Sequence, residues 1–227
     1  AKQENLDPYI GDVVAEKLKA FPDGHVYEKK ARDMRTLTTL EQKVNAHQTL
    51  DTNDLTFLYE INSTIEGFGY QKDPRIAELR ANRNPEADML TIFDCTREQI
   101  AHVPSEINER TKAYVGQLEP GIFQKLPATL EHIYTSFPER KIRRETVQIG
   151  GKSAKELITE MQAAGINISD YAQRMLQSGE FTPGRKTEQT TLIRLTVADL
   201  GFKTGATTDQ IYERAEALGM ELCPADT

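Results

Sequence analysis

The sequence predicts an α+β fold with a helix-rich N-terminal half and a C-terminal half that holds a small, mainly antiparallel sheet and capped helices. Three observations support this prediction. Residues 1–105 place apolar side chains at helical spacing almost throughout. From Thr111 onward, short alternating segments separated by Gly and Pro replace that pattern. Two later segments, 153–168 and 207–222, each combine a capped helix with a glycine and an apolar–polar alternation. We therefore expect a helical domain over 1–108 and an α+β domain over 109–227, with a soft boundary.

The N-terminal part is expected to form five or six short helices. An apolar stripe that begins at Ile10 and ends at Phe21 indicates the first, and Pro22-Asp23-Gly24 stops it. Leu37, Leu40 and Val44 indicate the second. Short connections between such helices are typical of a bundle or an orthogonal array.

Capping residues place the later helices of this part. Asp51 or Thr52 can cap a helix whose apolar stripe runs as far as Ile65. Asp73-Pro74 and Asn84-Pro85 each combine a capping side chain with Pro at the first helical position. A short helix is expected over REQIAHV, residues 97–103.

The C-terminal part is expected to hold the strands. Strand candidates cover 112–118, 130–137, 142–149 and 192–197, and IFQKL at 122–126 is a short helical piece. Residues 138–141 can turn the strand 130–137 back into 142–149 as a hairpin. A further helix is expected over 170–177.

Two helices in this part carry the clearest local signals. Ser153 with Glu156, and Thr207 with Gln210, form capping boxes that satisfy backbone N–H groups at each helix start. A glycine, Gly165 or Gly219, ends each helix, and a three-residue alternation over 166–168 or 220–222 predicts a strand. The two copies indicate either an internal duplication or a local pattern that recurs in unrelated folds.

Composition limits the classes of function. The net charge is −7 and the sequence pI about 5.3, which repels polyphosphate at long range and disfavours nucleic acid as a partner. Cys95 and Cys223 lack the spacing of a metal cage or a disulfide framework, which suggests a reducing compartment. No apolar run reaches membrane-spanning length, and AKQENLDPYI has no signal-peptide core. We expect a cytoplasmic protein without a membrane role.

Several long phrases resemble a known group of sequences. LYEINSTIEGFGYQKDPRIAELR, LEHIYTSFPERKIRRETVQIGGKSAKEL and LIRLTVADLGFKTGATTDQIYERAEALGMELCPA are similar to phrases that recur together in a conserved family of uncharacterised proteins from uncultured bacteria. The resemblance covers much of residues 55–225 and implies no activity and no catalytic residues. It also implies that the native chain continues beyond Thr227.

Four residues are candidates for catalysis. Cys95 could be a nucleophile activated by His102 and by the start of a helix at Thr96; a buried packing role explains the same pattern. His132 and Tyr134 share one face of the strand 130–137, and apolar residues take the other face. The two polar side chains could line a pocket or form the solvent-exposed (wet) face of a sheet. The wet face is the favoured interpretation, because alternation alone predicts it.

No metal or cofactor site is expected. The four histidines share no metal-ligand spacing, and Gly150-Gly151-Lys152-Ser153 lacks the upstream glycine of a phosphate-binding loop. The densest positive run is a binding candidate for phosphate or an acidic partner; the alternative is a charged hairpin tip that discourages edge pairing. It consists of Arg140, Lys141, Arg143 and Arg144.

Three functional hypotheses follow. The first, which the sequence favours, is a non-enzymatic interaction or accessory module that contacts a protein partner through the hairpin 130–144. The second is an enzyme of unknown type with a site between the two halves near the four catalytic candidates. The third is a nucleic-acid-binding module, because the helices 154–164 and 170–177 have the outline of a helix-turn-helix, although Arg174 is the only cation of its second helix.

Overall fold

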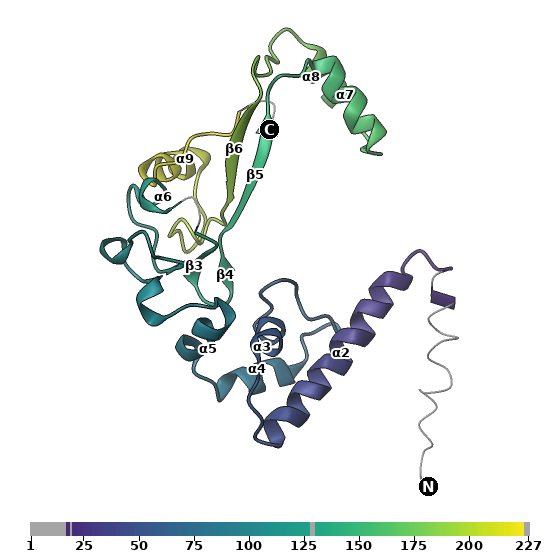
Figure 1. Ribbon diagram of the computed structural model, residues 1–227. Coiled ribbons are helices and arrows are strands. Elements are labelled where there is room, and N and C mark those ends of the chain that lie inside the picture. The colour runs from purple at the N-terminus through teal and green to yellow at the C-terminus, as the bar shows by residue number, and fades with distance from the viewer. Residues whose placement is uncertain (1–16, 19, 128–129, 225–227) are drawn as a thin grey trace. The chain divides into compact units, whose positions relative to one another are not determined.

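The computed structural model describes residues 17–18, 20–127 and 130–224 (Figure 1). It confirms the α+β class, with helices, one four-stranded mixed sheet and one two-stranded antiparallel sheet. The chain divides into two compact units, residues 1–97 and 98–227. The helix expected to begin at Ile10 falls mostly outside the described residues.

Unit 1 is helical, and its last three described helices begin where the caps predict, whereas α2 begins at Gly24 without a side-chain cap. Asp51 caps α3 through a capping box with Asp54, while Asp73 and Asn84 cap α4 and α5, with Pro at the first helical position of each. The short side chains at these positions accept hydrogen bonds from backbone N–H groups that have no intrahelical partner. The described helices of this unit are α2 (Gly24–Asn45), α3 (Thr52–Leu58), α4 (Pro74–Ala81) and α5 (Pro85–Ile92).

Two expected helices of this region differ in the structure. The helix predicted to run to Ile65 ends at Leu58, and Glu60 takes a left-handed φ of 54°. Ile65 packs instead with Leu37 and Ile76 in a small core. The helix predicted over 97–103 is wrong: a 3-10 turn, η1 (Arg97–Gln99), leads into a two-residue strand, Ile100–Ala101, that is buried and pairs with a neighbouring strand.

A buried polar cluster joins the last helices of unit 1. Asp88 accepts a hydrogen bond from the Tyr59 hydroxyl at 2.7 Å and a bidentate pair from the Arg83 guanidinium, both at 2.7 Å. Burial, followed by the hydrogen bond to Asp88, raises the pKa of Tyr59 far above its ordinary value, so the hydroxyl remains a donor. These hydrogen bonds fix α5 relative to the end of α3.

Unit 2 contains a four-stranded sheet that is partly parallel. Its strands lie in chain order, as β1 (Ile100–Ala101), β2 (Ala113–Val115), β3 (His132–Ser136) and β4 (Arg140–Lys141). β1 pairs with β2 and β2 with β3 in parallel, whereas β3 and β4 form an antiparallel hairpin. The turn expected over 138–141 instead covers 137–139, because Arg140 and Lys141 belong to β4. The short turn η2 (Pro104–Glu106) follows β1, and the helix α6 (Ile122–Lys125) lies between β2 and β3.

The second sheet is a long antiparallel ribbon. β5 (Arg143–Ile149) and β6 (Glu188–Arg194) pair over their whole length, from Arg143 opposite Arg194 to Ile149 opposite Glu188. The predicted strand 142–149 therefore exists, but it pairs with β6 and not with β3 as the expected hairpin required. The helices α7 (Ala154–Ala163) and α8 (Asp170–Gln177) follow β5 and lie beyond the end of the ribbon (Figure 1).

The two capped helices are confirmed, and the strands predicted after them are wrong. Both capping boxes of α7 and α9 (Thr208–Ala217) are present, and Gly165 and Gly219 have left-handed φ values of 74° and 88°. Segments 166–168 and 220–222 form no strand. A three-residue alternation has no partner edge to pair with here, and Ile166 and Leu222 remain largely exposed.

The core of unit 2 lies against one face of the four-stranded sheet. Tyr114 and Ile133 from the strands pack with Ile122 of α6 and Leu218, the residue after α9. Arg214 of α9 donates to the carbonyls of Leu200 and Leu118, which fixes the helix over this core. Among the described helices, none combines the length and the apolarity needed to cross a lipid bilayer.

Candidate functional site

The most distinctive surface of unit 1 is the loop 66–74, which we call the aromatic loop. Its sequence is EGFGYQKDP, and it exposes two rings: Phe68 is 58% exposed and Tyr70 is fully exposed. The Phe68 ring contacts the ring of Tyr27 on α2, with centroids 5.2 Å apart and a tilt of 55°. The loop therefore presents two large rings within three residues of each other, one packed on α2 and one in solvent.

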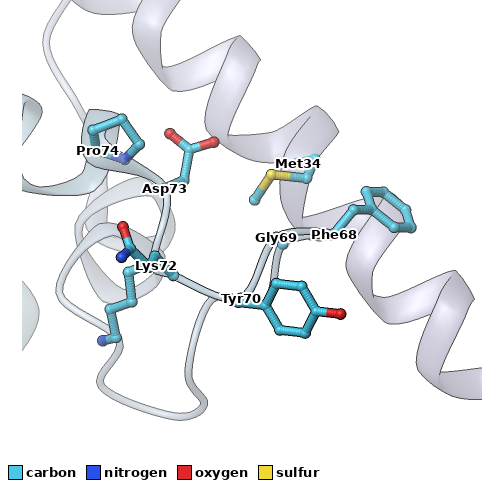
Figure 2. A pocket seen from close by; sticks show the side chains of 9 residues that line it. Met34, Phe68, Gly69, Tyr70, Lys72, Asp73 and Pro74 are labelled. Carbon is cyan, nitrogen blue, oxygen red and sulfur yellow. The ribbon is translucent and has the colours of Figure 1, made fainter.

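A pocket of about 530 Å³ lies within the aromatic loop (Figure 2). The loop itself lines most of it, and Met34 from α2 adds a flexible thioether side chain. Met34 lies beside Gly67, where a Cβ atom would be 3.6 Å from Met34 Sδ, and Arg75 Nη2 lies 3.9 Å from the same sulfur. Pockets of this size accommodate small ligands or a few side chains of a partner.

The first end of the aromatic loop is anchored by Asp33, a buried carboxylate on α2. Its Oδ2 accepts hydrogen bonds from the backbone N–H of Glu66 at 3.0 Å and from Lys29 Nζ at 2.6 Å. Lys29 Nζ also donates to the carbonyl of Thr64 at 2.6 Å. These contacts join the start of the loop to the long helix.

Glu60 joins the two ends of the aromatic loop. Its Oε1 accepts from the Ile65 N–H at 2.9 Å, and its Oε2 accepts from Lys72 and from Arg80. Burial opposes the ionisation of this carboxyl, but the hydrogen bonds from Lys72 and Ile65 outweigh it, and its pKa lies below the ordinary value. Glu60 is therefore charged at neutral pH and holds the two flanks together.

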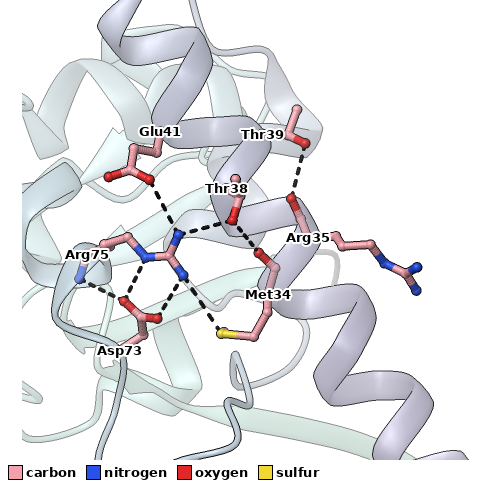
Figure 3. A network of polar contacts seen from close by, with 7 residues as sticks. All are labelled: Met34, Arg35, Thr38, Thr39, Glu41, Asp73 and Arg75. Carbon is pink, nitrogen blue, oxygen red and sulfur yellow. Dashed lines mark hydrogen bonds and ion pairs between the residues drawn. The ribbon is translucent and has the colours of Figure 1, made fainter. Parts of the chain in front are cut away.

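The second end of the loop is clamped by Arg75 at the start of α4 (Figure 3). Its guanidinium donates to both carboxylate oxygens of Asp73, at 3.0 and 2.8 Å, and to Thr38 and Glu41 of α2. The hydrogen bonds from Arg75 hold the pKa of Asp73 below its ordinary value. A planar guanidinium with this many partners fixes the geometry where the loop enters the helix.

The sequence-predicted catalytic residues are distributed over both units. Cys95 lies at the end of unit 1 and is partly buried, whereas the two histidines and Tyr134 belong to unit 2. His102 is exposed, and its Nδ1 lies 2.9 Å from the carbonyl of Val115. Val115 pairs with Tyr134 in the next strand, and His132 and Tyr134, two residues apart on β3, lie on the same face of the sheet.

The prediction that one face of the strand 130–137 is exposed to solvent is wrong at Tyr134. Its side chain has no exposed surface, packs edge-on against Phe137 at 5.3 Å, and has a pKa raised by burial to about 12. His132 is half-buried, and burial, followed by the charge of Lys141, lowers its pKa. Both groups are neutral at neutral pH, so neither carries charge to a substrate there.

The basic run divides between exposed and half-buried positions. Arg140 and Arg143 are exposed, and Arg140 Nη1 donates to the carbonyl of Ala198 at 3.3 Å. Lys141 and Arg144 are half-buried, and burial lowers the pKa of each. No group of three or more potential metal ligands occurs among the described residues.

The sequence analysis did not single out the residues of the aromatic loop. Their signal was present in the sequence, because Phe68 and Tyr70 are each preceded by a glycine and follow the end of a helix pattern. The contacts that anchor the loop could be identified only from the tertiary structure. No family model, curated protein or solved structure matches the chain, so its own geometry is the basis for interpreting the site.

Proposed function

We propose that this chain is a non-enzymatic interaction module that binds a protein partner through the aromatic loop. The observation that carries the proposal is the combination of two exposed rings, Phe68 and Tyr70, with a loop whose ends are fixed by Asp33, Glu60 and Arg75. Binding hot spots are enriched in aromatic residues, which bury a large area on contact.

The anchors matter because they reduce the entropy lost on binding. A flexible loop must be ordered when a partner binds, whereas a loop held at both ends is already close to its bound conformation. Function placed on a loop and positioned by a rigid scaffold is a general arrangement in proteins. The helices of unit 1 supply that scaffold through the contacts of α2 and α4 to the loop.

The test is selection of peptides from a phage-displayed library on the purified chain, followed by calorimetric titration of the selected peptides. The Phe68→Ala/Tyr70→Ala variant is expected to lose at least about tenfold in affinity, the effect of about 1.4 kcal/mol of lost contact. The control is Tyr171→Ala, which removes an exposed ring from α8 in unit 2. Selected peptides that bind the loop variant and the parent chain equally would contradict the proposal.

A further inference from the structure

Five cations gather where the ribbon of unit 2 begins. Arg143 of β5 and Arg194 of β6 lie directly opposite each other in the antiparallel register. Lys141 of β4 is close enough to Arg143 for that charge to lower its pKa. We call the whole set the basic cluster: Arg140, Lys141, Arg143, Arg144 and Arg194. Arg144 lies on the face of the ribbon opposite Arg143, and its Nη1 donates to the carbonyl of Pro127 at 3.4 Å.

Within the described residues, no member of the basic cluster forms an ion pair with a carboxylate. Asp199 is the carboxylate whose charge interacts with Arg140. Its Oδ1 accepts from Thr135 and its Oδ2 from the backbone and hydroxyl of Thr196, whereas Arg140 donates to the carbonyl of Ala198. The cations therefore keep donors available for a partner.

The arrangement is unfavourable for the isolated chain. Like charges directly opposite each other in an antiparallel pair destabilise it, and Arg143 with Arg194 is such a pair. Lys141 and Arg144 are also half-buried, which costs hydration of their charges. An anion bound at the cluster would offset both effects.

The ribbon beside the cluster offers backbone groups as well as charge. β5 and β6 form a two-stranded sheet, so among the described residues neither outer edge is covered by a further strand. Each strand is seven residues long, enough to pair with an extended peptide. Cations on edge strands also discourage aggregation, which is the alternative explanation for the cluster.

We propose that the basic cluster binds an extended acidic segment of a partner protein, whose carboxylates contact the cations while its main chain pairs with an outer edge of the ribbon. This is a second binding site, independent of the aromatic loop. A nucleic acid is disfavoured as the occupant, because no aromatic residue lies within 140–144 for base stacking.

Fluorescence anisotropy with a labelled decapeptide of alternating glutamate and threonine tests the proposal at low salt. The Arg143→Gln/Arg194→Gln variant is expected to bind it at least about tenfold more weakly, because two charge-assisted contacts are lost. The matched control, Arg174→Gln/Arg185→Gln, removes the same charge from exposed positions elsewhere in unit 2 and should bind like the parent chain. A thermal midpoint at or above that of the parent would show that the cluster variant is folded.

Two further probes distinguish strand pairing from charge contact alone, and an acidic peptide from a nucleic acid. The same peptide with alternate N-methylated residues keeps its charge but cannot pair with a strand edge, and it should bind at least tenfold more weakly. A ten-nucleotide thymidine oligomer should bind more weakly than the acidic peptide. Equal loss in the two variants, undiminished binding of the methylated peptide, or tighter binding of the oligonucleotide would each overturn the proposal.

Discussion

Arg75 and Asp73, two residues apart, form a bidentate ion pair with Nε–Oδ1 and Nη2–Oδ2 distances of 3.0 and 2.8 Å. Asp73 also caps α4 by accepting from the Arg75 backbone N–H. The same two residues therefore begin a helix and end the aromatic loop. Because Arg75 also reaches Thr38 and Glu41 on α2, the loop end is fixed to the longest described helix of unit 1.

Replacing Arg75 by Gln is expected to lower the free energy of unfolding by about 1–2 kcal/mol, because hydrogen bonds between charged groups are lost from a partly buried site. Arg75→Lys keeps the charge but cannot reproduce the planar bidentate contact, so it should recover less than half of the loss. Urea unfolding followed by circular dichroism measures both variants. If Arg75→Lys matches the parent chain, the charge alone accounts for the effect.

The Asp88 cluster provides a graded test of buried polar contacts. Tyr59→Phe removes one hydroxyl and should cost about 1 kcal/mol of stability. Asp88→Ala leaves the Arg83 guanidinium and the Tyr59 hydroxyl without their acceptor, and should cost about 3 kcal/mol. Chemical denaturation gives both values, and equal losses in the two variants would show that the carboxylate does not organise the cluster.

Gly219 and Gly165 end two similar helices in different surroundings. Both have left-handed φ values, so alanine at Gly165, where a Cβ meets open space, should cost about 1 kcal/mol. At Gly219 a Cβ would lie 2.9 Å from Cγ of Gln124, so Gly219→Ala should cost about 1 kcal/mol more. Adding Gln124→Ala should remove this excess at Gly219 and leave Gly165→Ala unchanged. Denaturation of the single and double variants tests the coupling.

Lowering the pH is expected to reduce the folding stability of unit 1 through protonation of Glu60. A carboxyl whose pKa is lowered in the folded state stabilises the fold above its unfolded pKa, about 4.3, and this contribution is lost as pH falls through the folded pKa. Glu60 is such a group, because its hydrogen bonds outweigh its burial. The urea midpoint should therefore fall less steeply in Glu60→Gln than in the parent chain between about pH 6 and pH 3. Parallel profiles would show that Glu60 does not contribute.

Local signals predicted the starts of helices well. Asp51, Asp73 and Asn84 cap the helices where the sequence indicated, because a capping side chain acts on backbone groups two or three residues away. Helix ends were less predictable. The helix expected to reach Ile65 stops at Leu58, since Ile65 is more favourably buried against Leu37 and Ile76 than on a continued helix.

The candidate sites also combine local sequence patterns with contacts that only the tertiary structure forms. The basic run was visible as a pattern, but Arg194, which completes the basic cluster, is fifty-one residues from Arg143 and joins it only through strand pairing. The rings of the aromatic loop were present in a glycine-rich segment, yet their exposure depends on Asp33, Glu60 and Arg75 from three separate places.

By itself the sequence determined the α+β class, the capping boxes at Ser153 and Thr207, and the left-handed glycines that follow them, because each depends on interactions within a few residues. The tertiary structure alone decided that β5 pairs with β6, that β1, β2 and β3 are parallel, and that Tyr134 is buried. Alternation indicates that a strand has two faces, but which face is covered and which strand lies beside it are set by packing among residues distant in the chain.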